Sequence, residues 1–290
     1  MTTAGSAAWL PALTASPAGR KVQHIMGIFS RLRDRRRQKL VKAMPIPDGR
    51  WEWVMKEHRI LRSLSSEEGL RLRNLATVFL AEKRFHPVGG IELDDDFRVS
   101  VAAQACLPVL NLGIDWYRSW KTVIVTGDAY GITRTETDEA GVVHEYQDEL
   151  GGELLGLGPV VLSKADVEAS GWGDGYNVPI HEAAHVIDGA DGSFDGCPAL
   201  PRDIDPEEWR SVFTAAYEKM RSEKRGGIKR VRGGRGARVR IDPYAAFSAD
   251  EFFAVCVEYF FEKPVVLRGD FPEVYALLVR FFRQDPYGRL

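Results

Sequence analysis

The chain has 290 residues, of which 44% are hydrophobic and 28% charged, values typical of a soluble globular protein. Its formal net charge of -2 argues against a nucleic-acid partner bound through the whole surface, and the absence of any apolar run of about 18 residues argues against a membrane span. Three cysteines lie far apart without a Cys-x-x-Cys pair, which indicates reduced thiols and a cytoplasmic location.

The N-terminal 44 residues differ in composition from the rest of the chain. The first 25 are rich in Ala, Thr, Ser and Pro and carry no positive charge before Arg20, so they make a poor secretory signal. Met26 precedes a basic run at residues 31–37 and is a candidate for the physiological start. We therefore expect residues 1–44 to be a disordered or basic extension, followed by one folded domain at 45–290.

The folded part alternates between helical and strand-like patterns. Residues 66–84 open with a capping signal and carry apolar residues at helical spacing, and residues 98–112 predict a buried helix broken at Pro108. Strands are expected at residues 91–93, 122–126 and 159–163, and further helices at 206–224, 250–262 and 271–283. Helices, a few strands and then more helices predict an α+β fold rather than repeated βαβ units.

One segment has an unusual composition. Residues 221–240 hold nine basic side chains, one acidic side chain and five glycines. The glycines and the repulsion between like charges predict a flexible, exposed loop. Because the segment contains no aromatic residue that could stack on bases, we favour a solvated loop over a nucleic-acid contact.

A His-Glu-x-x-His motif is the strongest chemical signal in the chain. Asn177 is a plausible N-cap and Pro179 fits the first turn, so the motif is expected on a helix. His181 and His185 then project from nearly the same face, where two imidazoles can share one tetrahedral zinc ion. Glu182 lies beside them as the general base for water activated by the metal. Such a site still requires a third protein ligand.

Two acids compete for the position of third ligand. Asp191 lies six residues beyond the second histidine, as in metzincins, but the glycine that should direct the turn comes one residue late, at Gly189. Glu251 lies on an apolar helix, where an unpaired buried carboxylate is costly and a metal would be a good partner. Glu258 lies on the same face and could accept a hydrogen bond from a ligating histidine. Salt bridges to arginines are the alternative for both glutamates.

The motif helix and the acidic helix together resemble the Mlc titration factor A family. The likeness rests on residues 175–188 and 241–261, with support from residues 107–113, 158–162 and 284–290. It runs from about residue 45 to the C-terminus. The resemblance implies a cytosolic bacterial zinc peptidase of the gluzincin type, with a catalytic core similar to that of anthrax lethal factor. It also implies a zincin-like fold, mostly helical with a small mixed sheet.

The same resemblance implies a set of site residues. The ligands of a single Zn²⁺ ion would be His181, His185 and Glu251. Tyr244 would lie near the metal, placed to donate a hydrogen bond to the tetrahedral oxyanion, and a packed tyrosine with a satisfied hydroxyl is the alternative. Glu258 and Asp188 are expected around the ligands.

The expected function is zinc-dependent hydrolysis of peptides or proteins, aminopeptidase-like in character. Members of the family bind the glucose repressor Mlc and lift its repression of the sugar phosphotransferase system, so an Mlc-like repressor is an expected partner. The alternative is a mainly regulatory, repressor-binding protein with secondary peptidase activity. The Arg/Gly-rich insertion before Ile241 departs from the family pattern and affects the entrance to the site.

Overall fold

The computed structural model describes residues 32–127, 158–225 and 240–290. The chain divides into two units, Met1–Met44 and Pro45–Leu290. In the first unit, residues 32–43 form a helix. Met26, the candidate start, lies outside the described residues, as do residues 226–239 of the expected loop.

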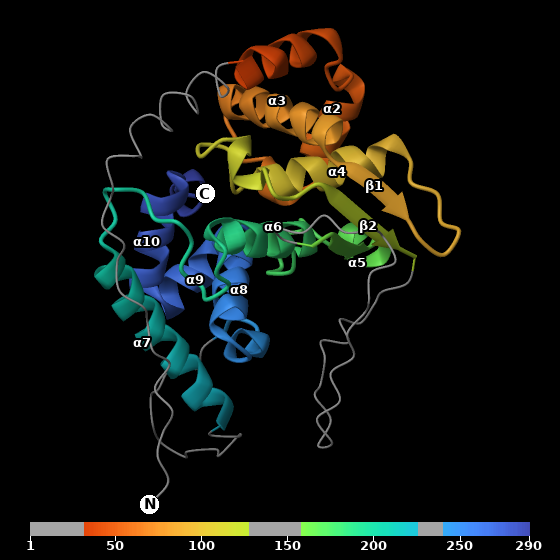
Figure 1. Ribbon diagram of the computed structural model, residues 1–290. Coiled ribbons are helices and arrows are strands. Elements are labelled where there is room, and N and C mark those ends of the chain that lie inside the picture. Colours follow the sequence, from red (N-terminus) through yellow and green to blue (C-terminus); the bar gives the residue numbers. More distant parts are fainter. Residues whose placement is uncertain (1–31, 128–157, 226–239) are drawn as a thin grey trace, which may run out of the picture. The chain divides into compact units, whose positions relative to one another are not determined.

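Of the three N-terminal helices of the second unit, the first two pack on the third, and the third contacts the motif helix. These helices are α2 (Asp48–Glu57), α3 (Ser66–Glu82) and α4 (Asp95–Cys106). Figure 1 shows α4 between α3 and the motif helix α6 (Val178–Asp188), in agreement with their contacts. The capping box expected at the start of α3 is present, because Ser65 Oγ accepts from Glu68 N–H while the Glu68 carboxylate accepts from Ser65 N–H. The helix expected to break at Pro108 ends at Cys106, which confirms that prediction.

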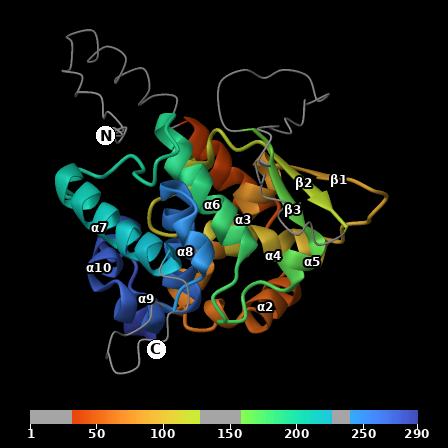
Figure 2. The ribbon, with the colours of Figure 1, turned by 90° about the horizontal axis from the view of Figure 1, so that it is seen from below.

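The C-terminal helices pack around α8 (Ala249–Glu262), which lies against α6. They are α7 (Pro206–Arg225), α9 (Pro264–Asp270) and α10 (Pro272–Phe282). Figure 2 shows α7 and α10 on the side of α8 away from the sheet. The prediction of a loop from residue 221 is wrong at its start, because α7 continues through residues 221–225. Good helix formers occupy four of these five positions, and the first glycines follow directly after them.

A three-stranded sheet lies beside the helices. Strands β1 (Arg84–Pro87), β2 (Thr122–Thr126) and β3 (Val160–Ser163) pair in that order. All three are parallel, so the described strands do not form the mixed sheet that was expected. The expected strand at residues 91–93 is also wrong: it is irregular and leads into Asp94, whose side chain caps α4 by accepting from Phe97 N–H.

Short elements complete the described chain. Helix α5 (Lys164–Glu168) follows β3 directly. Single 3-10 turns lie at η1 (Arg59–Leu61), η2 (Ile114–Tyr117), η3 (Gly189–Asp191), η4 (Pro243–Ala246) and η5 (Tyr287–Arg289). Across the described residues, no helix is both long and apolar enough to cross a membrane. The described part of the second unit is mostly helical, with a small sheet and a helix that carries the His-Glu-x-x-His motif.

Candidate metal centre and active site

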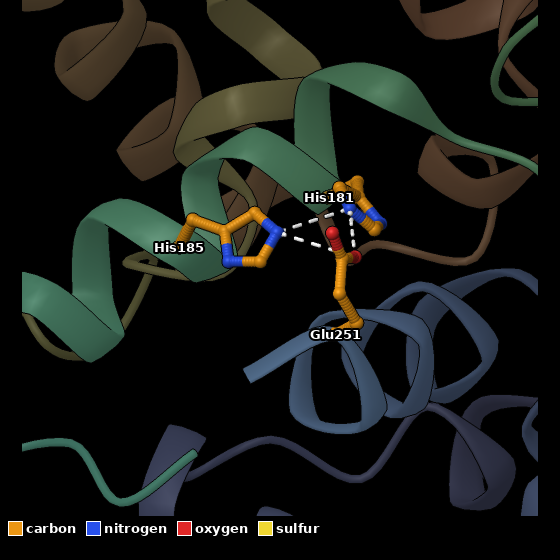
Figure 3. Close-up of side chains that lie close together, drawn as sticks. All are labelled: His181, His185 and Glu251. Carbon is orange, nitrogen blue, oxygen red and sulfur yellow. Dashed lines mark hydrogen bonds and ion pairs between the residues drawn. The ribbon is translucent and has the colours of Figure 1, made fainter. Parts of the chain in front are cut away.

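The motif helix begins at a strong N-cap. The Asn177 side-chain carbonyl accepts from Ile180 N–H at 3.0 Å, and Pro179 occupies the first turn. This start places His181 and His185 one turn apart on the face of α6 that meets α8. Figure 3 shows both rings pointing toward Glu251, which comes from the first turn of α8.

Three donor atoms converge at this contact. The Nε2 atoms of His181 and His185 lie 3.1 Å apart, and Oε2 of Glu251 lies 3.0 Å and 3.5 Å from them, respectively. A tetrahedral zinc ion, with ligands at about 2.0–2.1 Å, places its donor atoms about 3.3 Å apart. The triangle therefore has the size of one face of a zinc coordination tetrahedron. Within the described chain, no other group of three His, Cys, Asp or Glu side chains has metal-site spacing.

The electrostatics of the cluster favour a cation. Burial lowers the pKa of His181, but the neighbouring carboxylates of Glu258 and Glu251 outweigh it and raise that pKa to about 10. Burial raises the pKa of Glu251, whereas the two neighbouring histidines hold it well below its usual value. Oε2 of Glu251 is buried and accepts no hydrogen bond of good geometry from the described residues. A metal ion would satisfy this atom, so the residues present fit a metal.

The residues around the three donors lie only partly where the sequence predicted them. Glu258 Oε1 lies 2.6 Å from His181 Nδ1, the ring nitrogen that faces away from the cluster. Tyr244 does not point at an open position, because its hydroxyl donates to Glu251 Oε1 at 2.5 Å. Asp188 is fully buried and accepts from Gly196 N–H at 2.9 Å rather than from a histidine ring. Burial raises the pKa of Asp188 to about 7.

The rival ligand, Asp191, is not brought to the histidines. It lies exposed in η3, where its carboxylate accepts from the backbone N–H and the hydroxyl of Ser193. The turn at Gly189 therefore directs Asp191 toward Ser193 and not toward the histidines. This geometry agrees with the spacing argument against a metzincin arrangement.

Two pockets flank the cluster. One, of about 330 Å³, is lined by Glu182, His185 and Glu251 together with Asp250, Phe194 and the chain entering β3. The other, of about 210 Å³, includes His181, Tyr244 and Glu258 in its wall. Burial raises the pKa of Glu182, which suits a carboxylate that must accept a proton during a reaction.

Two acidic residues at this site were not predicted from the sequence. Asp250 lines the larger pocket, and Glu262 lies buried one turn beyond Glu258 on α8. The signal for Glu262 was present, because it is a further acid on the same face of an apolar helix. Asp250 carries no such signal, since it stands in an ordinary position in the first turn of a helix.

Comparison with known proteins identifies the family. The model of the glucose-regulated metallopeptidase M90 family matches residues 32–283. Mlc titration factor A of Enterobacter sp. is 35% identical over 80% of this chain and 84% of its own length, and that of Yersinia pestis is 35% identical over 80% and 83%. An uncharacterized protein of Synechocystis sp. is 30% identical over 86% and 89%. The chain therefore belongs to the M90 family of metallopeptidases, with the Mlc titration factor A proteins among its relatives, and is a hydrolase.

Proposed function

We propose that the protein is a zinc-dependent peptidase in which His181, His185 and Glu251 hold one Zn²⁺ ion. The observation that carries this proposal is the triangle of two imidazole nitrogens and one carboxylate oxygen, with sides of 3.0–3.5 Å. Two nitrogens and one oxygen form a donor set typical of catalytic zinc. A zinc ion bound there would acidify water and polarise a peptide carbonyl.

The surrounding residues have distinct tasks in this proposal. Glu182 accepts a proton from the attacking water and returns it to the leaving amine. Glu258 holds the His181 ring by accepting its Nδ1–H, which leaves Nε2 free to bind the metal. Tyr244 donates to the carbonyl oxygen that becomes negative, after exchanging its hydrogen bond with Glu251 for one with substrate. Asp188 anchors the end of α6 through Gly196.

The larger pocket supports an aminopeptidase-like preference. Among the described residues, Asp250 has no cationic partner and no Lys or Arg lines the pocket. An acidic wall near the metal centre suits the α-ammonium group of a peptide. Phe194 and Val160 give the same pocket an apolar side. The wild-type protein should cleave free peptides faster than N-acetylated ones, and the Asp250→Asn variant should lose that preference. An equal loss on both substrates would argue for an endopeptidase.

The main test combines metal analysis with two variants. The wild-type protein should bind one zinc ion per chain and cleave members of a peptide library. Glu182→Gln should bind the same amount of zinc but lose activity by a factor of about 10²–10⁴, the usual contribution of a general base. His181→Ala should lose both metal and activity. Full activity in Glu182→Gln, or a wild-type protein that takes up no zinc, would refute the proposal.

A second function is favoured by the relatives. Proteins named Mlc titration factor A are 35% identical to this chain over 80% of its length. We propose that this protein also binds an Mlc-type repressor in the cytoplasm, with the domain at residues 45–290 as the binding unit. Zinc-stripped protein should be used in a pull-down with the repressor. Binding that survives loss of zinc would favour a mainly regulatory role, and no binding in either form would exclude this partner.

A further inference from the structure

A buried hydrogen-bond network adjoins the histidine cluster through Glu258, which also lines the smaller pocket. It joins Asn177 at the start of α6 to Glu258 and Glu262 of α8 and to Gln104 of α4. Asn177 and Gln104 are fully buried, and each glutamate is only 6% exposed. Four polar residues therefore meet where α6 packs against α4 and α8.

Asn177 is the centre of this network. Its backbone N–H donates to Glu258 Oε2 at 2.8 Å, and its side-chain amide donates to Glu262 Oε1 at 2.8 Å and to Gln104 Oε1 at 2.8 Å. Its side-chain carbonyl caps α6. A single residue thus fixes the start of the motif helix and contacts the carboxylates of Glu258 and Glu262.

Glu262 needs these contacts because of its position. It lies one turn from Glu258, and like charges at this spacing repel each other. Neither acid forms an ion pair with Lys or Arg in the described part of the chain, and Glu262 receives its second hydrogen bond from Gly173 N–H at 2.6 Å. The loop that supplies this N–H runs close to α8: Gly175 has φ +97°, and a Cβ there would lie 2.8 Å from the Tyr259 ring.

Glu258 connects this hydrogen-bond network to the proposed metal centre. Glu258 accepts from Asn177 N–H with one oxygen and faces His181 Nδ1 with the other. If Asn177 shifts, Glu258 loses the contact that aims its second oxygen at the ring. The rotation and the tautomer of His181 then lose their support, because a ligating histidine is oriented by the partner of its other nitrogen.

We propose that Asn177 and Glu262 are positioning residues of the metal centre. Glu262 holds Asn177, Asn177 holds Glu258, and Glu258 keeps the His181 Nε2 lone pair directed at the position between His185 and Glu251. This inference rests on the proposed metal site.

The Asn177→Asp variant tests the proposal. An aspartate keeps the helix cap and the backbone N–H, but it removes the amide donor and places a third carboxylate against Glu262. Zinc affinity, measured by competition with a chelator, should fall by about 10–100-fold, the usual cost of losing support around a ligand. The absorption spectrum of the Co²⁺-substituted protein should change, because it reports ligand geometry directly. Activity at saturating metal should fall in kcat with little change in KM.

Two further variants separate positioning from general stability. Asn111→Asp also removes an amide donor, one that bonds Arg283 C=O at 2.6 Å far along the sequence from the histidines, and should leave zinc affinity within about two-fold. Combining N177D with E262Q restores a donor and acceptor pair in reverse order, since the new amide can donate to the new carboxylate. The pair should recover most of the lost zinc affinity and the Co²⁺ spectrum. If N177D does not fold, E262Q alone should show a smaller loss of the same kind.

The outcomes are distinct. If the wild-type protein binds no zinc, the proposed function fails and the network has no metal to support. If the wild-type protein binds zinc but N177D and E262Q bind it equally well, the positioning proposal is overturned. An equal loss in N111D overturns it as well, because the effect is then one of general stability.

Discussion

The two faces of α8 differ sharply in chemistry although both are buried. The face toward α6 carries Glu251, Glu258 and Glu262, whose carboxylates contact histidines, an asparagine and backbone N–H groups. The opposite face is aromatic. There Phe252 packs near Phe271 at 5.6 Å between ring centroids, and Phe260 near Tyr275 at 5.1 Å.

The two faces of α8 therefore contribute differently to stability and to function. The aromatic face buries large apolar rings in close contact, which is the main source of folding free energy. The acidic face buries charged groups, which costs free energy unless each group is paired. Three such acids lie on one side of this 14-residue helix, the side that the proposed metal site would use, whereas the aromatic face contributes stabilising burial.

The largest expected effect is on the aromatic face. Phe260 is fully buried among Phe261, Tyr275 and Phe282. Phe260→Ala should lower the free energy of unfolding by about 3–5 kcal/mol, because it removes buried surface and leaves a cavity. Urea denaturation measures this loss, and Phe260→Leu should lose less. The folded variant should bind zinc within two-fold of wild type. A tenfold change in zinc affinity would show that the two faces are not separate.

The stability of the fold should also depend on pH, through a buried histidine away from α8. His58, at the end of α2, is 4% exposed, with Nε2 located 2.7 Å from Ser100 Oγ of α4, and burial lowers its pKa from 6.5 to about 4. Between these values the unfolded chain binds a proton that the folded chain does not. This group therefore stabilises the fold fully above pH 6.5, and up to about 3 kcal/mol is lost as pH falls to 4.

Denaturation curves at several pH values, measured for two variants, separate the contribution of His58 from that of Glu262. Burial raises the pKa of Glu262 to about 7, so Glu262 changes stability in the direction opposite to His58. Its contribution to stability falls as pH rises from 4.5 to 7. His58→Gln should flatten the acid side of the profile, and Glu262→Gln should flatten the neutral side. A wild-type slope that neither variant changes would contradict both assignments.

A smaller effect is expected at Glu258. Glu258→Gln keeps the shape of the side chain but removes the charge opposite His181 Nδ1. Zinc affinity should fall by about 10–100-fold, equivalent to about 1.4–2.7 kcal/mol. The near-ultraviolet circular dichroism should stay the same, because the aromatic face is untouched. Chelator competition gives the affinity, and a changed aromatic signal would break the proposed separation.

The smallest effect should lie away from both faces. Arg71 and Glu67 form an exposed pair one turn apart on α3, with 45% and 81% of their side-chain surface exposed. Arg71→Ala should change the free energy of unfolding by less than about 0.5 kcal/mol, since water and salt screen such pairs. Neither zinc affinity nor activity should move. This variant provides a baseline for the other variants.

Local patterns predicted much of this molecule. The cap at Asn177, the helix that follows it and the two histidines on one face all depend on residues within about four positions of one another. The same holds for the capping box at Ser65 and for strand β2, which occupies residues 122–126 as expected. The acids at positions 251 and 258 share a face because of their spacing alone. The sequence by itself thus determined which side chains are available and on which side of each helix they lie.

Only the tertiary structure decided which of these side chains meet. Spacing could not show that Tyr244 bonds Glu251, that Asp188 turns to Gly196, or that Asn177 also joins two acids of α8. The strand expected at 91–93 lay instead at β1, because pairing with β2 decides which segment becomes a strand. Such contacts join residues up to 85 positions apart. They arise from how helices pack, and the identity of a residue and its near neighbours does not encode the partner that packing brings to it.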